Sequence, residues 1–187
     1  MTGPTFKTLP GGKIESTITY MEMRSRPVTP TPPSPAKKLS LLHAERPSVA
    51  FYRFLYNTVG ADWLWYERRA MDDDTLARII HDPKVEIYVL YVAGVPAGYV
   101  ELDCRKMPDI ELAYFGLMPD FIGQGLGGFL LRWAIDQAWD KAPERVWVHT
   151  CTEDHPSAFG TYQRAGFAPY ERETIVIDDP RKGGLFN

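Results

Sequence analysis

Residues 110–141 read IELAYFGLMPDFIGQGLGGFLLRWAIDQAWDK, and this stretch decides how the chain folds. It starts as a strand, breaks at 117–119 and resumes as a glycine-rich turn that leads into a helix. The glycines carry no Cβ atom, so the backbone can turn tightly and bring several N–H groups toward one point. The start of the helix adds unpaired N–H groups and about half a unit of positive charge. The stretch therefore predicts a binding site for an anion such as a phosphate or pyrophosphate.

The composition limits the class of protein. The chain has 187 residues, 44% of them hydrophobic, which is enough for one globular domain with its own core. Its net charge is −3 and it has no long basic run, so we expect no nucleic-acid partner. No apolar run approaches the ~18 residues of a membrane span, and 1–12 does not resemble a signal peptide, so we expect a cytoplasmic protein without membrane contact. Cys104 and Cys151 predict free thiols rather than a disulfide framework.

The hydrophobic periodicity alternates between strand and helix along the chain. It predicts, in order, a strand over 13–23, helices over 48–56 and 72–82, strands over 86–92, 97–105 and 110–117, a helix over 125–141, a strand over 145–151, a helix over 154–165 and a strand over 170–177. Short turns between three consecutive strands predict antiparallel hairpins, and the strand–helix–strand unit that follows predicts a parallel pair. The expected fold class is therefore α+β, with a mixed, mostly antiparallel central sheet that is split at the strand break and flanked by helices.

We expect a single domain over 13–178, preceded by a flexible N-terminus at 1–12 and followed by a polar tail at 179–187. Within the domain, residues 26–36 contain five prolines (Pro27, Pro30, Pro32, Pro33 and Pro35). Proline cannot donate a hydrogen bond to a sheet and disfavours helix in the residue before it, so this segment is an extended connector. It is either a solvated spacer or a loop that folds over the mouth of a substrate site.

Two motifs resemble those of a known family. They read Leu117-x-Pro119 followed by Gly123-x-Gly125-x-Gly127, and Ala158-x-x-x-Tyr162-x-x-x-Gly166-Phe167. Together, over roughly 86–170, they resemble the GNAT family of N-acetyltransferases, and the order of the elements agrees with a GNAT-like fold. The sequence departs from the family pattern at Ile122, where the family has Arg or Gln, and at His155, where it usually has Asn. The first departure removes a polar side chain near the expected phosphates but leaves the main-chain N–H groups in place.

The resemblance implies a reaction and roles for particular residues. It implies acetyl-CoA as donor, no metal, and a primary amine that attacks the thioester directly in a ternary complex. Glu111 matches the catalytic glutamate that takes the amine proton, although Glu101, Asp103 or a water chain could do so instead. The Leu117 N–H would stabilise the oxyanion, and Tyr162 would protonate the leaving thiolate. The expected cofactor-binding residues are Leu117, Gly123, Gln124, Gly125, Leu126, Gly127 and Gly128.

The acceptor is a small-molecule or peptide amine whose identity the sequence leaves open. Aromatic side chains could line its pocket and a carboxylate could hold its charge. The expected substrate-binding residues are Trp63, Tyr99, Glu101 and Tyr114, with Trp65, Tyr66 and Asp103 as further candidates. Exposed strands near the last helix could also pair two copies of the chain in a homodimer.

Other kinds of site are weaker readings of the same residues. The glycines also satisfy the dinucleotide-binding pattern G-x-G-x-x-G, but 119–122 separates them from the strand and too little chain follows for a doubly wound sheet. Cys151 has no His–Asp partner that the sequence identifies, so we expect no covalent acyl-enzyme, and His149 is expected to be a packed histidine. No cluster has metal-ligand spacing. The remaining alternative to an enzyme is a catalytically silent CoA-binding sensor or interaction domain of the same fold.

Overall fold

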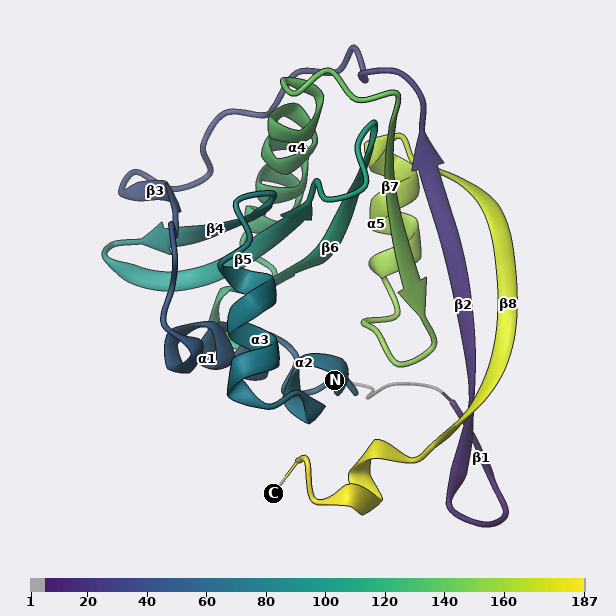
Figure 1. The fold of residues 1–187 in the computed structure, drawn as a ribbon. Coiled ribbons are helices and arrows are strands. Elements are labelled where there is room, and N and C mark those ends of the chain that lie inside the picture. Colours follow the sequence, from purple (N-terminus) through teal and green to yellow (C-terminus); the bar gives the residue numbers. More distant parts are fainter. Residues whose placement is uncertain (1–5, 187) are drawn as a thin grey trace.

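A computed structural model describes residues 6–186 (Figure 1). The strands are β1 (Lys7–Leu9), β2 (Lys13–Met23), β3 (Leu39–His43), β4 (Val85–Val92), β5 (Val95–Asp103), β6 (Asp109–Leu117), β7 (Arg145–Cys151) and β8 (Ala168–Asp178), and the helices are α1 (Val49–Val59), α2 (Glu67–Ala70), α3 (Asp73–Ile80), α4 (Leu126–Trp139) and α5 (Ala158–Ala165), with short 3-10 turns at Pro119–Phe121 and Pro180–Gly183. The described strands form one sheet in the order β1-β2-β7-β6-β5-β4-β3, and β8 pairs with β2. All pairs are antiparallel except β6 with β7, which confirms the predicted fold class.

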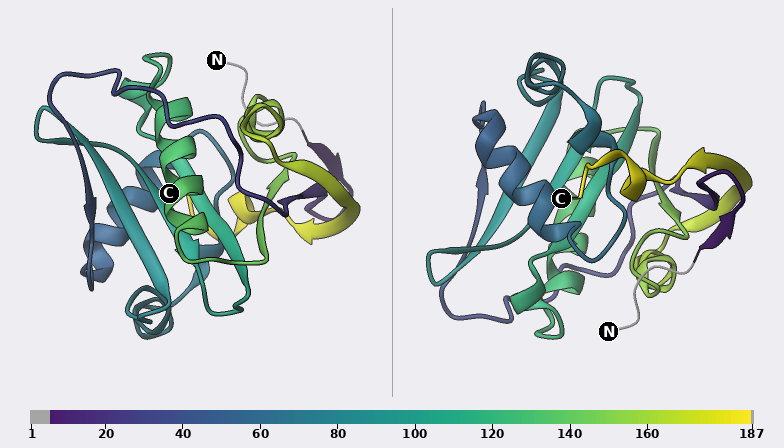
Figure 2. Two further views of the ribbon diagram at one scale, coloured as in Figure 1. Left: turned by 90° about the horizontal axis from the view of Figure 1, so that it is seen from above. Right: turned by 90° about the horizontal axis from the view of Figure 1, so that it is seen from below.

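Two hydrophobic cores lie on opposite faces of the sheet (Figure 2). On one face, α4 packs its apolar stripe, including Leu130 and Ala134, against β5, β6 and β7. On the other face, α1 and α3 pack against β4 and β5, with Tyr52 and Leu76 fully buried. Burial on both faces explains why the central strands are apolar with little alternation.

The parallel pair β6–β7 is hydrogen-bonded for only part of its length. Pairing runs from Asp109 opposite Arg145 to Glu111 opposite Trp147 and then stops, although β6 continues to Leu117 and β7 continues to Cys151. Beyond this point β7 follows β2, with which it pairs antiparallel. As a result, β6 and β7 separate (Figure 1). The split predicted from the sequence therefore lies between these two strands.

Residues 26–36, hereafter the strap, fold against α4 rather than into solvent. The Arg26 guanidinium donates to Asp136 at 3.0 Å and to Asp140 at 2.7 Å, and the Thr31 hydroxyl donates to Asp136. The strap connects β2 to β3, at opposite sides of the sheet, by crossing the face that carries α4 and α5 (Figure 2, left). The segment is therefore packed against the domain, and its role as a cover over a substrate site stays a prediction.

The ends of the chain and its shortest elements differ from the expectation. Lys7–Leu9 pairs with β2 instead of forming a loose end, while residues 1–5 lie outside the described part. The sequence analysis did not identify β3, whose residues LSLLH do not alternate strictly, or the single-turn helix α2. In the polar tail, Pro180–Gly183 forms a 3-10 turn.

No helix between residues 6 and 186 is both long enough and apolar enough to cross a bilayer.

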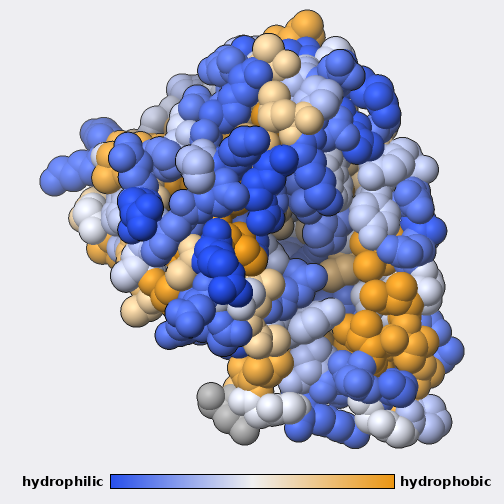
Figure 3. Space-filling model, in the orientation of Figure 1, coloured by the Kyte–Doolittle hydropathy of each residue, from blue (hydrophilic) through white to orange (hydrophobic). Residues whose placement is uncertain are grey.

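The edge strand β8 is exposed along most of its length. Apolar side chains gather where β2 and β8 run together (Figure 3), and Val176 on β8 is 53% exposed. Free strand edges can pair with another chain, so the homodimer expected from the sequence stays a prediction.

A buried ion pair lies within the core under α1. Glu101 on β5 is fully buried, and its carboxylate accepts from the Arg68 guanidinium at 2.7 Å and from the Tyr52 hydroxyl at 2.5 Å. Burial raises the pKa of Glu101, although Arg68 and Tyr52 oppose the shift. The charges compensate each other, so removing one leaves the other buried without a partner.

We predict that Glu101→Gln lowers the free energy of unfolding by roughly 3–5 kcal/mol, because it leaves the Arg68 charge uncompensated in the core. Urea denaturation followed by tryptophan fluorescence measures this loss. The matched control Glu171→Gln, on exposed β8, should change stability by less than about 0.5 kcal/mol. A loss of under about 1 kcal/mol in Glu101→Gln would contradict the role of this pair in stability.

Candidate functional site

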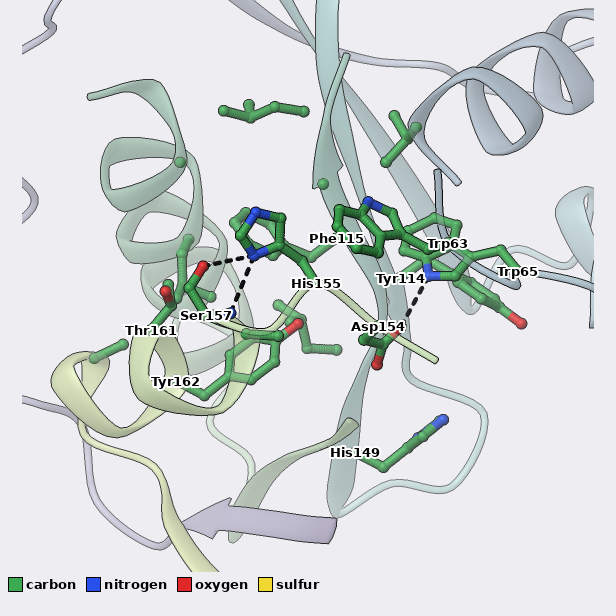
Figure 4. Close-up of a pocket in the computed structure, with 18 of the residues that line it drawn as sticks. Trp63, Trp65, Tyr114, Phe115, His149, Asp154, His155, Ser157, Thr161 and Tyr162 are labelled. Carbon is green, nitrogen blue, oxygen red and sulfur yellow. Dashed lines mark hydrogen bonds between the residues drawn. The ribbon is translucent and has the colours of Figure 1, made fainter. Parts of the chain in front are cut away.

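A cavity of about 700 Å³ opens where β6 and β7 separate (Figure 4). Its walls come from segments that are far apart in the sequence. One part is formed by residues 63–67, which lead into α2, and by residues 112–117 of β6. The other part is formed by the glycine-rich turn with α4, the end of β7, the β7–α5 loop and α5. Thr29, Pro30 and Pro32 of the strap also line it. The cavity is therefore the space that the interrupted strand pairing leaves, closed on one side by the proline-rich segment.

Glu111 and His149 meet near the point where the two strands separate. His149 Nδ1 lies 3.3 Å from Glu111 Oε1. His149 lines the cavity, whereas Glu111 is not among its lining residues. Burial by itself lowers the pKa of His149, but the contact with Glu111 outweighs burial and holds this pKa above its ordinary value. With Nδ1 directed at the carboxylate, Nε2 of His149 is left to accept a proton.

The Leu117 N–H points toward the split. Met118 N donates to the Ala97 carbonyl on β5 at 2.9 Å. Successive amides of a strand point to opposite edges, so the Leu117 amide points away from β5, on the side where β7 no longer pairs. Leu117 also lines the cavity. A main-chain donor without a strand partner can stabilise negative charge on a reacting oxygen.

Tyr162 reaches the same cavity from α5. Its side chain is 7% exposed, and its hydroxyl points toward the middle of the cavity (Figure 4). Burial, followed by the nearby Asp154 and Cys151, raises the pKa of Tyr162 well above its ordinary value. The phenol therefore stays protonated at neutral pH and is available as a proton donor.

The glycine-rich turn has the backbone geometry of an anion site. Gly123 and Gly125 have φ of 82° and 77°, in the left-handed region that favours glycine, and Gly125 is the N-cap of α4. A Cβ atom built at Gly123 or Gly128 would meet nothing within 4 Å, so open space adjoins the start of the helix. The Gln124 side chain donates to the Asp120 carbonyl at 2.8 Å, which ties the turn to the 3-10 turn before it.

The wall opposite this turn is aromatic and acidic. The Tyr114 hydroxyl donates to the Glu67 carboxylate at 2.6 Å. The Trp65 indole N–H donates to Asp154 at 2.9 Å (Figure 4). Both carboxylates line the cavity, and each is oriented by an aromatic donor. Such a wall can hold a cation against aromatic faces.

His155, one of the two positions that depart from the pattern of the family that the sequence resembles, has a local structural role. Its Nδ1 accepts from the Ser157 N–H at 3.0 Å, just before α5. The Trp63 ring packs edge-on against the imidazole at 4.8 Å between centroids. An acceptor side chain at this position fixes the turn in the way an asparagine does.

Two of the expected acceptor residues lie elsewhere. Tyr99 and Glu101 are fully buried in the core under α1 and do not line the cavity. Asp103, the rival base, is also outside the cavity and pairs with Arg105 at 2.5 Å. Trp63 and Tyr114 do line it, as do Trp65 and Tyr66. The structure therefore corrects the position of Tyr99 and Glu101, because β5 lies one strand further from the split than β6 and α1 covers their side chains.

Cys151 lines the cavity but is poorly suited to act as a nucleophile. Burial, together with Asp154 and Glu153, raises the pKa of its thiol, so little thiolate forms at neutral pH. Cys104 is also a free thiol. Among residues 6–186, no group of three or more histidine, cysteine or acidic side chains is arranged to hold a metal ion.

The sequence analysis did not assign to the site several polar or charged residues that line the cavity, and four of them matter for the argument below. These are Glu67, Arg132, His149 and Asp154. For His149 a signal existed, because it lies on the same face as Trp147 and Cys151 of a strand that follows a predicted crossover helix. For Asp154 the signal was its position directly after that strand, at the edge where ligands bind in such sheets.

Comparison with known proteins gives consistent results. The sequence profile of the acetyltransferase (GNAT) family matches residues 50–167. A Bacillus subtilis (strain 168) protein, named as an alanine N-acetyltransferase of ribosomal protein bS18, is 27% identical over 97 residues, which cover 52% of this chain and 63% of that protein. The chain thus matches less than two thirds of the length of this relative.

Solved structures share the fold at low sequence identity. A GNAT-family acetyltransferase from Novosphingobium aromaticivorans has a TM-score of 0.59 at 16% identity, covering 92% of this chain and 69% of that one. The ribosomal-protein-S18-alanine N-acetyltransferase from Escherichia coli has a TM-score of 0.57 at 16% identity, covering 74% of this chain and 90% of that one. These similarities show the fold alone.

We predict that Glu111→Gln lowers the pKa of His149, because the charge that favours the imidazolium is lost. NMR titration of the imidazole resonances measures this shift, with Glu171→Gln on exposed β8 as control. In the wild type the folded pKa is the higher one, so protonation of His149 stabilises the fold below the unfolded pKa. This contribution disappears as the pH rises through the folded pKa. An unchanged titration of His149 in Glu111→Gln would show that the two groups are not coupled.

Proposed function

The chain belongs to the GNAT family of acetyltransferases, and we propose that it transfers the acetyl group of acetyl-CoA to a primary amine by direct attack in a ternary complex. The observation that carries this proposal is the convergence of three groups on one cavity. These are the Glu111–His149 pair, the Leu117 N–H and the Tyr162 hydroxyl, which come from β6, β7 and α5. A proton acceptor, an oxyanion donor and a proton donor are the groups that acyl transfer to an amine requires.

The residues that would hold acetyl-CoA fit its chemistry. The φ values at Gly123 and Gly125 and the free start of α4 suit a pyrophosphate. The strands that separate beside Phe115 and Leu117 offer main-chain groups to an extended, amide-containing arm. When bound, the cofactor supplies an activated thioester carbonyl.

Within this proposal, each protein group handles one proton or one charge. His149 takes the proton of the incoming ammonium at Nε2, while Glu111 orients the ring through Nδ1 and stabilises its protonated form. The Leu117 N–H would stabilise negative charge on the carbonyl oxygen. Tyr162 would give its proton to the leaving sulfur and recover the second proton that the amine nitrogen loses as the amide forms. This assigns Glu111 a positioning role behind His149, in place of the direct base role expected from the sequence.

The acceptor amine would occupy the aromatic and acidic wall. Glu67 and Asp154 can attract an ammonium group, and Trp63, Trp65 and Tyr114 can pack against the carbon chain that bears it. Two relatives are named for N-acetylation of an alanine of ribosomal protein S18, so a peptide with an N-terminal alanine is the first acceptor to test.

An acceptor panel tests the proposed reaction. The protein is mixed with acetyl-CoA and with peptides that have a free N-terminal alanine, peptides whose only amine is a lysine side chain, or small primary amines, and the release of free thiol is measured. We expect release that depends on an acceptor, with acetylated amine identified by mass spectrometry. Binding of CoA without acceptor-dependent release would favour the catalytically silent CoA-binding domain.

We predict that Tyr162→Phe lowers kcat by about 100-fold, because the leaving sulfur loses its proton donor, while the affinity for CoA stays unchanged. Steady-state kinetics and calorimetric CoA binding measure the two quantities, with Tyr170→Phe, on exposed β8, as the matched control. An unchanged kcat in Tyr162→Phe would remove this residue from the mechanism.

A further inference from the structure

Arg132 on α4 is a buried cation that has no partner for part of its guanidinium group. Only 8% of the residue is exposed. Within residues 6–186, its Nη1 atom has no hydrogen-bond partner. The carboxylate one turn further along the helix, Asp136, is engaged by Arg26 and Thr31 of the strap instead. A guanidinium group stays charged at any physiological pH, so this buried charge calls for an anion.

The position of Arg132 indicates where that anion would lie. Arg132 lines the cavity and sits four residues after Gly128, on the same face of α4. Helical side chains lean toward the N-terminus of the helix, so the guanidinium group extends toward the glycine-rich turn. The absence of a side chain at Gly128, where a built Cβ would meet nothing within 4 Å, leaves room there.

The cationic groups of the cavity are separated from its carboxylates. Arg132 and Arg164 come from α4 and α5, whereas Glu67 and Asp154 come from α2 and the β7–α5 loop. The Arg164 Nη2 atom already donates to Thr161 at 3.0 Å and the side chain is exposed, so Arg132 is the less satisfied of the two cations. An anion would therefore bind against α4, away from the acidic wall.

We propose that Arg132 binds a phosphate group of the cofactor and supplies the polar side chain that the glycine-rich turn lacks at Ile122. This inference rests on the proposed function, because it assumes a coenzyme A group in the cavity. A guanidinium fork matches phosphate geometry with two parallel hydrogen bonds. Thr29, Pro30 and Pro32 of the strap line the same cavity and keep water from competing for this contact.

Calorimetric binding to the full chain tests the proposal. Arg132→Met keeps the apolar stem and removes the charge, Arg132→Lys keeps a charge without the fork, and Arg172→Met on exposed β8 is the matched control. We expect Arg132→Met to weaken CoA binding by roughly 10–100-fold, with Arg132→Lys intermediate and the control unchanged. Pantetheine, which has no phosphate, should bind wild type and Arg132→Met equally.

The ligand series identifies the phosphate. If Arg132→Met weakens binding of both CoA and 3′-dephospho-CoA, the contact is to the pyrophosphate. If only CoA is affected, the contact is to the 3′-phosphate. Both results support the proposal. An equal loss for pantetheine would overturn it, because Arg132 would then shape the cavity or bind another part of the ligand.

The stability of the ligand-free protein gives an independent measurement. Removal of an unpaired buried charge should leave the Tm of Arg132→Met unchanged or raise it, while the increase in Tm caused by CoA becomes smaller. A lower Tm with an undiminished CoA effect would overturn the proposal. If Arg132→Met does not fold, Arg132→Lys must still bind CoA more weakly than wild type, and equal affinity would overturn it. Failure of the wild type to bind CoA would instead overturn the proposed function.

Discussion

The interrupted hydrogen bonding between β6 and β7 is the constraint on which the rest of the site depends. Pairing ends at Glu111 opposite Trp147 because β7 continues along β2 while β6 stays with β5. Main-chain groups that are buried without a partner are costly, so the strands can separate only where something else can satisfy those groups. The cavity, the orientation of the Leu117 amide and the meeting of Glu111 with His149 all follow from this one interruption.

The second organising feature is the separation of charge around the cavity. The start of α4 and Arg132 make one wall electropositive, and Glu67 with Asp154 make another acidic. The acidic wall is connected to the core, because the Arg68 guanidinium that pairs with buried Glu101 also lies 5.2 Å from the centre of the Tyr114 ring. Tyr114 in turn orients Glu67. A charge pair that has no contact with the cavity thus helps to hold one of its walls in place.

Much of the fold follows from local sequence patterns, whereas the site depends on facts that those patterns do not contain. Periodicity predicts most strands and helices, and the left-handed glycines of the turn mark the start of α4. Alternation along β5 places Tyr99 and Glu101 on one face of the sheet but does not say that β5 lies one strand away from the split or that α1 covers it there, which is why both were assigned to the acceptor pocket. His149 was taken for a packed residue because its partner, Glu111, is distant in sequence. The proline content of the strap predicts an extended backbone, but only its contacts with Asp136 and Asp140 determine where it lies.

The path of the strap has a consequence for how ligands come and go. It is continuous with β2 at one end and β3 at the other, so it forms a closed bridge of backbone over the cavity. A long, flexible molecule held below it would leave by sliding out lengthwise, or after the latch formed by Arg26 with Asp136 and Asp140 of α4 opens. Because that latch is partly exposed to solvent, its strength falls as ionic strength rises. The residence time of such a molecule would therefore shorten as the salt concentration rises.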